Sequence, residues 1–291
     1  MAVTLCASDL TVIPYYGAIK YDNAASKSLK DSAQFLGLSG IWNNEAKSKN
    51  VEVTYIHTKT DYKSTTSIDS VLEHDLTVKY RVSNDDFRLK VGFHYVYSDE
   101  DLSYVDLGTG YVGILGLEGF SSFDKDHLSY GVEAYYSAYL DAHDESTLAY
   151  TRMVDVMQFT PYLGYSRIFG DSIRNDLKLK INVIATTQYK DQGYYSYEVE
   201  DTFVYRGFYM TLKYLGGEMR SGVMNGGTTL FNNKDLILNY YDCKIGYYIT
   251  PTLAMDITMG GMNYQEYDPF NLKLLPDGRN SIALLSLSAT F

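Results

Sequence analysis

Apolar and polar side chains alternate with a period of two along most of the chain. The clearest run is FRLKVGFHYVY at 87–97, where every second residue is apolar or aromatic and the residues between include Arg88 and Lys90. LTVKYRV at 76–82 and DLKLKINVIATTQY at 176–189 repeat the scheme. Successive side chains of a strand point to opposite faces, whereas no stretch shows a convincing helical period. The pattern predicts an all-β protein.

About fourteen strands are predicted, with twelve or sixteen as alternatives because pattern-derived boundaries shift by a few residues. The eleventh strand has the weakest pattern, and it depends on a tight turn at Gly216 and Gly217 in YLGGEM. The expected strands are centred near 11–22, 33–43, 51–62, 72–82, 87–97, 109–119, 128–139, 153–166, 176–189, 200–214, 218–224, 236–249, 252–265 and 281–291.

The expected connectors alternate in length. VSNDDF, YLGGEM and ITPTL are short, whereas SDEDLSYVDLG, LDAHDESTLAYTR, YKDQGYYSYEVED, NGGTTLFNNK and YDPFNLKLLPDGRN are longer and polar. Short turns on one rim and long loops on the other are typical of outer-membrane β-barrels. An even strand number also places both termini on the short-turn rim. The acid-rich loops favour a solvated surface, with divalent-cation binding as a weaker alternative.

The last stretch, SIALLSLSATF, is apolar on one face. That face carries Phe291, Ala289, Leu287 and Leu285. An edge strand this apolar needs partners on both sides or a lipid environment, and a closed barrel in a bilayer supplies both. The rival fold is a large soluble β-sandwich or barrel, in which the polar face would be the outer surface.

Composition narrows the class further. The chain has 30 tyrosines and 23 glycines against 5 prolines, a mixture that favours strands and turns. No stretch approaches the roughly 18 consecutive apolar residues of a membrane helix. A net charge of -11 argues against nucleic-acid binding. Cys6 and Cys243 have no metal-type spacing, so neither a disulfide nor a metal site is predicted.

The domain organisation is expected to be simple. Residues 1–10, MAVTLCASDL, resemble the end of a secretory signal, with an ordinary N-terminal segment as the alternative. Residues 11–291 are expected to form one barrel.

The terminal Phe291 behind alternating apolar residues resembles the C-terminal signal that the barrel assembly machinery reads. The whole chain resembles a Gram-negative outer-membrane β-barrel, and its length and strand number resemble the monomeric fourteen-stranded porins of the OmpG type. The fatty-acid transporters of the FadL type also have fourteen strands, but they carry an N-terminal hatch domain. A first strand near residue 11 leaves no room for that hatch. The resemblance implies outer-membrane localisation, with outer-membrane lipid, lipopolysaccharide and the assembly machinery as partners.

Charged residues on the polar face would line the lumen of such a barrel. Opposed arcs of charge would order permeating ions, whereas pairing between neighbouring strands would merely keep the lumen wet, and pairing is the favoured alternative. The candidate cations are Lys79, Arg81, Arg88, Lys90, Lys178 and Lys180. The candidate acids are Glu52, Glu118, Glu133 and Asp256, with Asp242 less secure.

The predicted function is a porin, a water-filled channel through which small polar solutes diffuse without a cofactor. Tyrosines at strand ends are expected to form membrane girdles, with a sugar-stacking track at Tyr135 and Tyr139 as an alternative. A substrate-specific transporter for apolar compounds would need apolar inward residues, and Ile282 and Leu284 are slight support for it. A plugged structural or adhesive barrel is a further alternative. An enzyme is the least favoured, because the HDES stretch at 143–146 shows only sequence adjacency.

Overall fold

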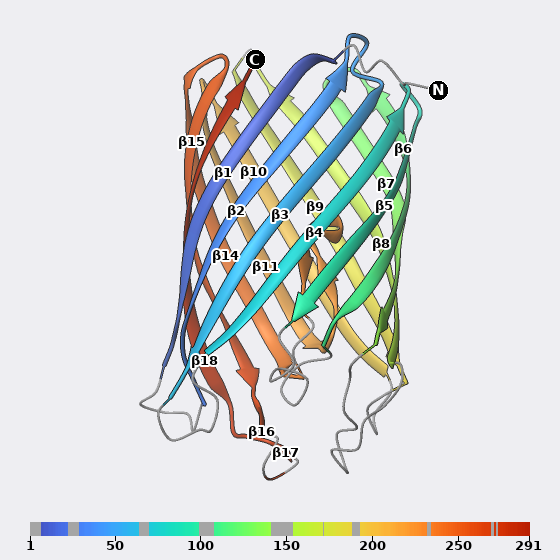
Figure 1. Cartoon of the computed structure of the whole chain (residues 1–291). Coiled ribbons are helices and arrows are strands. Elements are labelled where there is room, and N and C mark those ends of the chain that lie inside the picture. Colours follow the sequence, from blue (N-terminus) through green and yellow to red (C-terminus); the bar gives the residue numbers. More distant parts are fainter. Residues whose placement is uncertain are drawn as a thin grey trace, which may run out of the picture.

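Fourteen antiparallel strands close into one barrel (Figure 1). A computed structural model describes residues 7–22, 29–63, 70–98, 108–140, 154–170, 172–187, 193–231, 234–268, 271 and 273–291. Each wall strand pairs with its neighbour in sequence order, and β1 closes on β18. In the described part of the chain, no helix is both long and apolar enough to cross a bilayer. The predicted all-β fold and strand number are confirmed.

The wall strands are 12 to 16 residues long, which exceeds the roughly 9 to 11 residues that a tilted strand needs to cross a bilayer. They are β1 (Ala7–Tyr21), β2 (Lys30–Asn44), β3 (Lys49–Tyr62), β4 (Ser70–Ser83), β5 (Phe87–Ser98), β6 (Gly110–Phe123), β7 (Asp126–Tyr139), β8 (Val154–Phe169), β9 (Ile173–Thr186), β10 (Gly193–Tyr205), β11 (Phe208–Met219), β14 (Leu236–Thr250), β15 (Leu253–Gln265) and β18 (Gly278–Thr290). The first strand begins at Ala7, four positions before the expected start of the barrel, and residues 1–6 of the signal-like segment lie outside the described residues.

The outer surface of the barrel is apolar. Leu38, Phe159 and Ile181 are 51%, 51% and 55% exposed, and each lies on the outward face of its strand. Many further outward positions are exposed leucines, methionines and tyrosines. Contiguous apolar surface of this extent would aggregate in water, whereas it suits contact with lipid acyl chains. Every wall strand is paired on both sides, so the sheet has no open edge. These are the properties of a barrel that spans a membrane.

The expected boundaries of two strands are wrong. The pattern placed strands at 200–214 and 218–224 with a turn at Gly216 and Gly217, whereas the turn lies at Arg206 and Gly207 between β10 and β11. Both turn residues have positive φ, 45° and 86°, as a tight two-residue hairpin turn requires. Gly217, with φ of 100°, instead lies at a register shift between β11 and β14. The two glycines therefore serve a bulge, and the expected connector 189–201 largely belongs to β10.

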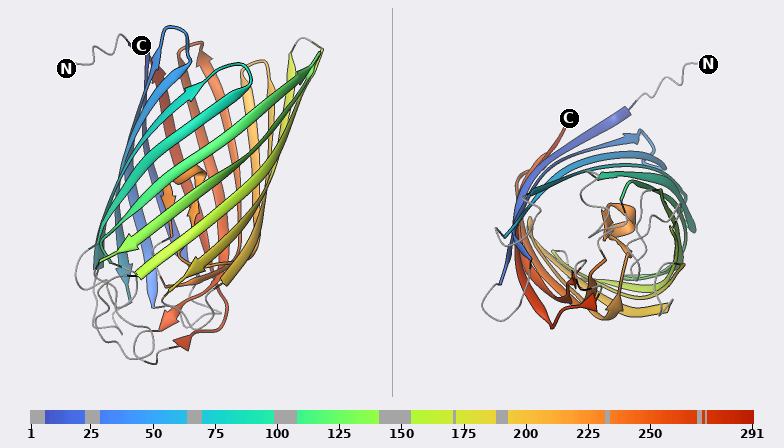
Figure 2. Two further views of the ribbon diagram at one scale, coloured as in Figure 1. Left: turned by 90° about the vertical axis from the view of Figure 1, so that its right-hand side faces the viewer. Right: turned by 60° about the horizontal axis from the view of Figure 1, so that its bottom comes forward.

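A segment between β11 and β14 folds into the barrel. It contains β12 (Val223–Met224), the short 3₁₀ turn η2 (Asn225–Gly227) and β13 (Thr229–Leu230). The right-hand view of Figure 2, in which the long-connector end comes forward, shows this turn inside the lumen. We call residues 222–231 the lumen segment. Its base is a hairpin, because Phe231 N donates to Gly222 O at 2.9 Å.

Buried charges hold the chain on either side of the lumen segment at the long-connector end. Lys30 forms an ion pair with Asp235, and both side chains are almost fully buried. Asp235 also accepts a hydrogen bond from Tyr267 N at 3.0 Å, while Arg220 Nε donates to the Lys234 carbonyl at 2.7 Å. Tyr267 belongs to β16 (Tyr267–Asp268), which pairs with β17 (Lys273–Leu274) beside the rim. Breaking a buried pair of this kind by removing one partner is strongly destabilising, so the segment is firmly anchored at its base.

Candidate functional site

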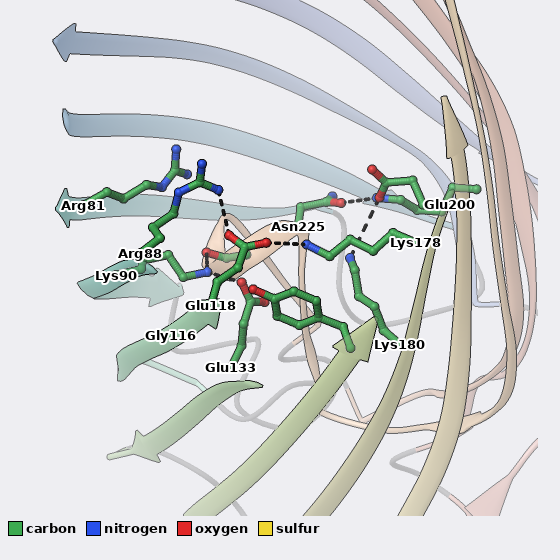
Figure 3. A pocket seen from close by; sticks show the side chains of 13 residues that line it. Arg81, Arg88, Lys90, Gly116, Glu118, Glu133, Lys178, Lys180, Glu200 and Asn225 are labelled. Atoms are coloured by element: carbon green, nitrogen blue, oxygen red, sulfur yellow. Dashed lines mark hydrogen bonds and ion pairs between the residues drawn. The ribbon is translucent and has the colours of Figure 1, made fainter. Parts of the chain in front are cut away.

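The lumen holds a charged cavity of about 400 Å³ on the short-turn side of the lumen segment (Figure 3). We call this cavity the chamber. Side chains from eight wall strands, β4 to β11, meet there with the tip of the lumen segment. Its lining consists of Arg81, Arg88, Lys90, Gly116, Glu118, Glu133, Tyr162, Lys178, Lys180, Glu200, Lys213, Asn225 and Gly226.

The inward direction of the predicted cations is correct, and the structure places five of the six in the chamber. Arg88 NH1 donates to Glu118 Oε2 at 2.7 Å, and Lys178 Nζ lies 3.9 Å from the other oxygen of the same carboxylate. Arg88 and Glu118 are direct cross-strand partners on β5 and β6. Lys178 comes from β9, three strands further around the wall, so Glu118 joins two parts of the lumen surface.

Lys90 reaches its partner across an intervening strand. In the sheet register Lys90 on β5 stands beside Gly116 on β6, which stands beside Glu133 on β7. A Cβ at Gly116 would lie 2.9 Å from Lys90 Cε, so the missing side chain gives the lysine room to pass. Its ammonium forms an ion pair with Glu133, which also accepts a hydrogen bond from Tyr135 at 2.5 Å.

The structure leaves several of the predicted charges outside the chamber. Lys79, the sixth predicted cation, lies 2.7 Å from Glu52, and Arg81 contacts the other oxygen of that carboxylate at 2.8 Å. Asp256 lies on a different part of the wall, where it accepts from Ser286 Oγ at 2.6 Å. Asp242, the less secure inward acid, accepts from Tyr240 OH at 2.6 Å. Pairing between strands, the favoured alternative, therefore describes most of the lumen charges.

Sequence reasoning missed three charged residues that belong with the chamber, namely Glu198, Glu200 and Lys213. Lys180 Nζ lies 2.5 Å from Glu198 and 3.8 Å from Glu200, while Lys213 lies 3.4 Å from Glu200. The two glutamates were missed because residues 193–201, the first part of β10, were taken for a connector. The alternation of exposed Tyr195 and Tyr197 with buried Ser196 and Glu198 is the signal that identifies the strand.

The tip of the lumen segment is bound to the wall by polar contacts. Lys90 Nζ donates to Gly226 O at 3.3 Å, and Lys213 Nζ donates to Asn225 Oδ1 at 2.5 Å. Gln158 on β8 makes two hydrogen bonds with the backbone of Val223, at 2.7 and 2.9 Å.

A histidine adds a further contact to the tip. His94 Nδ1 lies 3.2 Å from Gly227 O, and His94 Nε2 lies 2.8 Å from Asp75. Residues on β5, β8 and β11 thus hold one loop across the lumen.

The half of the lumen toward the long connectors contains a large apolar cluster, which is bordered by the buried charges of Lys30, Arg220 and Asp235. Inward residues near the long-connector ends of the wall strands pack there against the lumen segment, and they are at most 8% exposed. The cluster consists of Tyr21, Ala33, Val96, Tyr139, Val154, Val156, Ile184, Tyr194, Leu215, Met219, Met224, Leu236, Ile237, Met262 and Tyr264. The lumen is therefore divided into a packed, largely apolar region toward the long connectors and a charged chamber toward the short turns.

On the other side, the chamber continues toward the short-turn rim. A second cavity of about 630 Å³ shares Arg88, Glu118, Lys178 and Glu200 with the chamber, and it extends to Asp85 in a short turn. Polar solutes from that rim can reach the chamber through this vestibule.

The tyrosines divide between the two faces of the wall. Tyr16, Tyr136 and Tyr247 are about half exposed on the outer surface, as expected of membrane girdles. Tyr135 and Tyr139 point inward but are 4% and 0% exposed. The alternative of a sugar-stacking track on these two rings is therefore wrong, since neither offers a free face.

Other sequence-based expectations fall outside the described residues. The HDES stretch at 143–146 lies there, and so does all of the acid-rich connector 98–108 except its first and last residues. Among the described residues, no group of three or more His, Cys, Asp or Glu side chains is arranged to hold a metal ion.

No protein-family model matches the chain, and no curated protein matches it. Solved structures do match its fold. The monoaromatic hydrocarbon channel CymD has 8% identity and a TM-score of 0.54, over 97% of this chain and 88% of that one. The toluene transporter TodX of Pseudomonas putida has 10% identity and a TM-score of 0.52, over 97% and 89%. At this identity the likeness concerns the fold alone.

Proposed function

We propose that this barrel is a gated, substrate-specific channel of the Gram-negative outer membrane that admits small molecules with an apolar body. The observation that carries the proposal is the division of the lumen. Its outer half is lined by apolar inward side chains on which the lumen segment packs. The proposal thus favours the apolar-compound transporter over the open porin, the function first expected from the lumen charges.

The physical reason lies in the solvation of the path. An open porin needs a continuous column of water, which requires polar side chains along the whole lumen. Here the half toward the long connectors offers mostly packed tyrosine, valine, leucine and methionine surfaces, where a polar solute would lose its hydration and regain few hydrogen bonds. An apolar body loses nothing by that exchange. The hydrocarbon and toluene channels that share the fold support this choice by analogy.

The lumen segment acts as the gate in this proposal. Its tip is held by a few hydrogen bonds across the lumen, whereas the chain at its base is held by a buried ion pair and a buried hydrogen bond from Arg220. Loss of the tip contacts would free the inner part of the segment while its base stays in place.

A passive porin remains the second candidate function, because the chamber and its vestibule are strongly polar and extend to the short-turn rim.

Excision of residues 223–230 tests both candidates. Gly222 and Phe231 are already hydrogen bonded, so a Gly-Gly link between them closes the chain without moving β11 or β14. In planar bilayers we expect the native barrel to show rare, small current steps and the excised barrel to show large, stable steps. In a porin-deficient Gram-negative host, the native barrel should raise the uptake of labelled toluene but not that of arabinose, whereas the excised barrel should raise both.

Stable large steps and rapid arabinose uptake by the native barrel would support the passive porin and overturn the gated channel. A native barrel that raises neither uptake, although it is folded in the membrane, would overturn both candidates.

A further inference from the structure

The chamber has an excess of positive charge. With Lys79, Glu52 and Glu198, which contact residues of the lining or their partners, the group has seven cations and five acids and a formal charge of +2. The lining itself has six cations and three acids, a formal charge of +3. The cations are Arg81, Arg88, Lys90, Lys178, Lys180 and Lys213, and the acids are Glu118, Glu133 and Glu200. The excess stands out against a chain whose net charge is -11.

The acids are shared between cations. Glu118 alone contacts both Arg88 and Lys178, whereas Lys180 and Lys213 share two glutamates, Glu198 and Glu200. A carboxylate that serves two cations neutralises only half of their charge. The walls around the chamber are of low dielectric, so the remaining positive charge acts strongly on an anion that enters.

Three of these cations present accessible edges to the cavities. The side chains of Arg81, Arg88 and Lys178 are 34%, 44% and 31% exposed. Each already touches one carboxylate with part of its donor set. An arginine has five N–H donors in a fork that matches a carboxylate, so a second acceptor fits the side that faces the cavity.

The same chamber contains two of the lysines that hold the gate. Lys213 donates to Asn225 and Lys90 to the carbonyl of Gly226 at the tip of the lumen segment. Both acceptors are neutral, and a hydrogen bond to a charged acceptor is roughly twice as strong. An anion in the chamber would therefore compete with the tip for these two ammonium groups.

An apolar surface lies directly behind the tip. Gly227 packs so closely on Ile114 that a Cβ there would lie 2.3 Å from Ile114 Cδ1. Ile114, Val112, Tyr135 and Val223 form a buried apolar cluster at this place. Release of the tip would expose this cluster beside the cations of the chamber.

We propose that the chamber is a binding site for the carboxylate head of a small amphipathic molecule, and that the bound carboxylate releases the tip of the lumen segment. The inference rests on the proposed channel function and adds a favoured class of substrate, molecules with an apolar body and an anionic head, to the neutral apolar compounds already proposed. The apolar body would lie against the cluster at Ile114. The head would lie among Arg81, Arg88 and Lys178, in the same cavity as Lys90 and Lys213, and would compete with the tip for the ammonium groups of these two lysines.

Calorimetric titration of the refolded barrel in detergent at constant ionic strength tests the site. Benzoate is the probe, benzamide is its neutral isostere, and acetate and inorganic phosphate are anions without an apolar body. We expect benzoate to bind at least about tenfold more tightly than each of the other three, because only benzoate satisfies both halves of the site.

The double variant Arg81→Gln with Lys178→Gln lowers the formal charge of the lining from +3 to +1. It leaves Glu52 paired with Lys79 and Glu118 paired with Arg88, so no buried acid loses its last partner. Benzoate affinity should fall at least about tenfold. Lys244→Gln is the matched control, since this lumen lysine contacts Asp256 outside the chamber and its loss should leave benzoate affinity unchanged.

Single-channel recording tests the release of the tip. Benzoate should raise the open probability of the native barrel, and it should have no such effect after excision of residues 223–230. Folding of every variant is checked by its heat-dependent mobility on a gel.

Equal binding of benzoate and phosphate would overturn the assigned ligand class, and absence of benzoate binding by the folded barrel would overturn the site. Binding without any change in open probability would overturn the release. Toluene uptake by the same protein separates these failures from failure of the channel function itself, because uptake of the neutral hydrocarbon does not require the anion site.

Discussion

At the scale of single residues, glycines let long side chains cross neighbouring strands inside the lumen. Gly116 leaves room for Lys90 to reach Glu133, and Gly131 leaves room for the ring of Tyr162. Both glycines and the side chains that pass over them line or adjoin the chamber. The geometry of the chamber therefore requires residues without a side chain at positions 116 and 131.

The substitution Gly131→Ala should destabilise the barrel. A Cβ there would lie 2.3 Å from the carbonyl oxygen of Leu117 and 2.7 Å from Tyr162 Cζ, so the backbone of the paired strand would have to move. We expect the free energy of unfolding to fall by about 1 to 3 kcal/mol, measured by urea unfolding in lipid vesicles. Gly113→Ala is the control, because its nearest atom, Tyr136 O, is 3.9 Å away. Equal unfolding midpoints for the two variants would contradict the packing described at Gly131.

At the scale of elements, the hairpin of β10 and β11 determines which acids enter the lumen. Its turn at Arg206 and Gly207 sets the register in which Glu200 stands opposite Lys213. Strand side chains alternate faces, so a slip of one residue would turn Glu198 and Glu200 to the lipid. The positive φ angles of the two turn residues therefore bear directly on the charge of the chamber.

Two substitutions test whether the turn requires glycine at its second position. Gly207→Ala meets no atom closer than 3.8 Å, so the penalty is that of a non-glycine residue at a φ of 86°. That penalty is about 1 to 2 kcal/mol. Arg206→Gly, at a φ of 45°, should change the free energy of unfolding by less than about 1 kcal/mol. Urea titrations of both variants measure the difference, and a Gly207→Ala barrel as stable as the native one would show that the turn does not need glycine.

At the scale of the whole molecule, the barrel is closed by its last strand. Phe291 N donates to Leu10 O at 2.9 Å, and Leu10 N donates to Phe291 O at 3.1 Å. The terminal side chain is 76% exposed on the outer surface, where it is available to a partner. Along β18, Leu285 and Leu287 share that outward face and are exposed, and Ala289, the fourth residue of the proposed assembly signal, follows the same alternation.

Deletion of Phe291 should impair assembly of the barrel in cells while leaving the folded barrel stable. It removes two hydrogen bonds of a seam that keeps the pairs from Thr11 with Thr290 to Tyr21 with Asn280. We expect several-fold less barrel in the outer membrane, while refolding in detergent still gives the heat-dependent gel shift. Phe291→Tyr keeps the aromatic ring and should assemble normally. Equal amounts of the deleted and native barrels in the membrane would contradict a role for Phe291 in assembly.

The sequence alone determined the class of the fold, the strand number and the face on which most charges lie. These properties follow from a period of two, which is local and can be read wherever a strand is recognised. Arg88, Lys90 and Lys178 were therefore placed in the lumen correctly. Glu198 and Glu200 were not, because the glycine pair at 216 and 217 resembled a turn and displaced the neighbouring strand.

Only the tertiary structure decided which charges meet and whether the lumen is continuous. Glu118 contacts Lys178 because the wall curves back on itself, and Val223 binds Gln158 because a connector folds inward. Both contacts join residues about 60 positions apart. A connector has no periodic pattern that reveals its path, since its course depends on side chains contributed by remote strands. The gate and the chamber on its short-turn side thus belong to the folded barrel, although every residue that forms them can be read in the sequence.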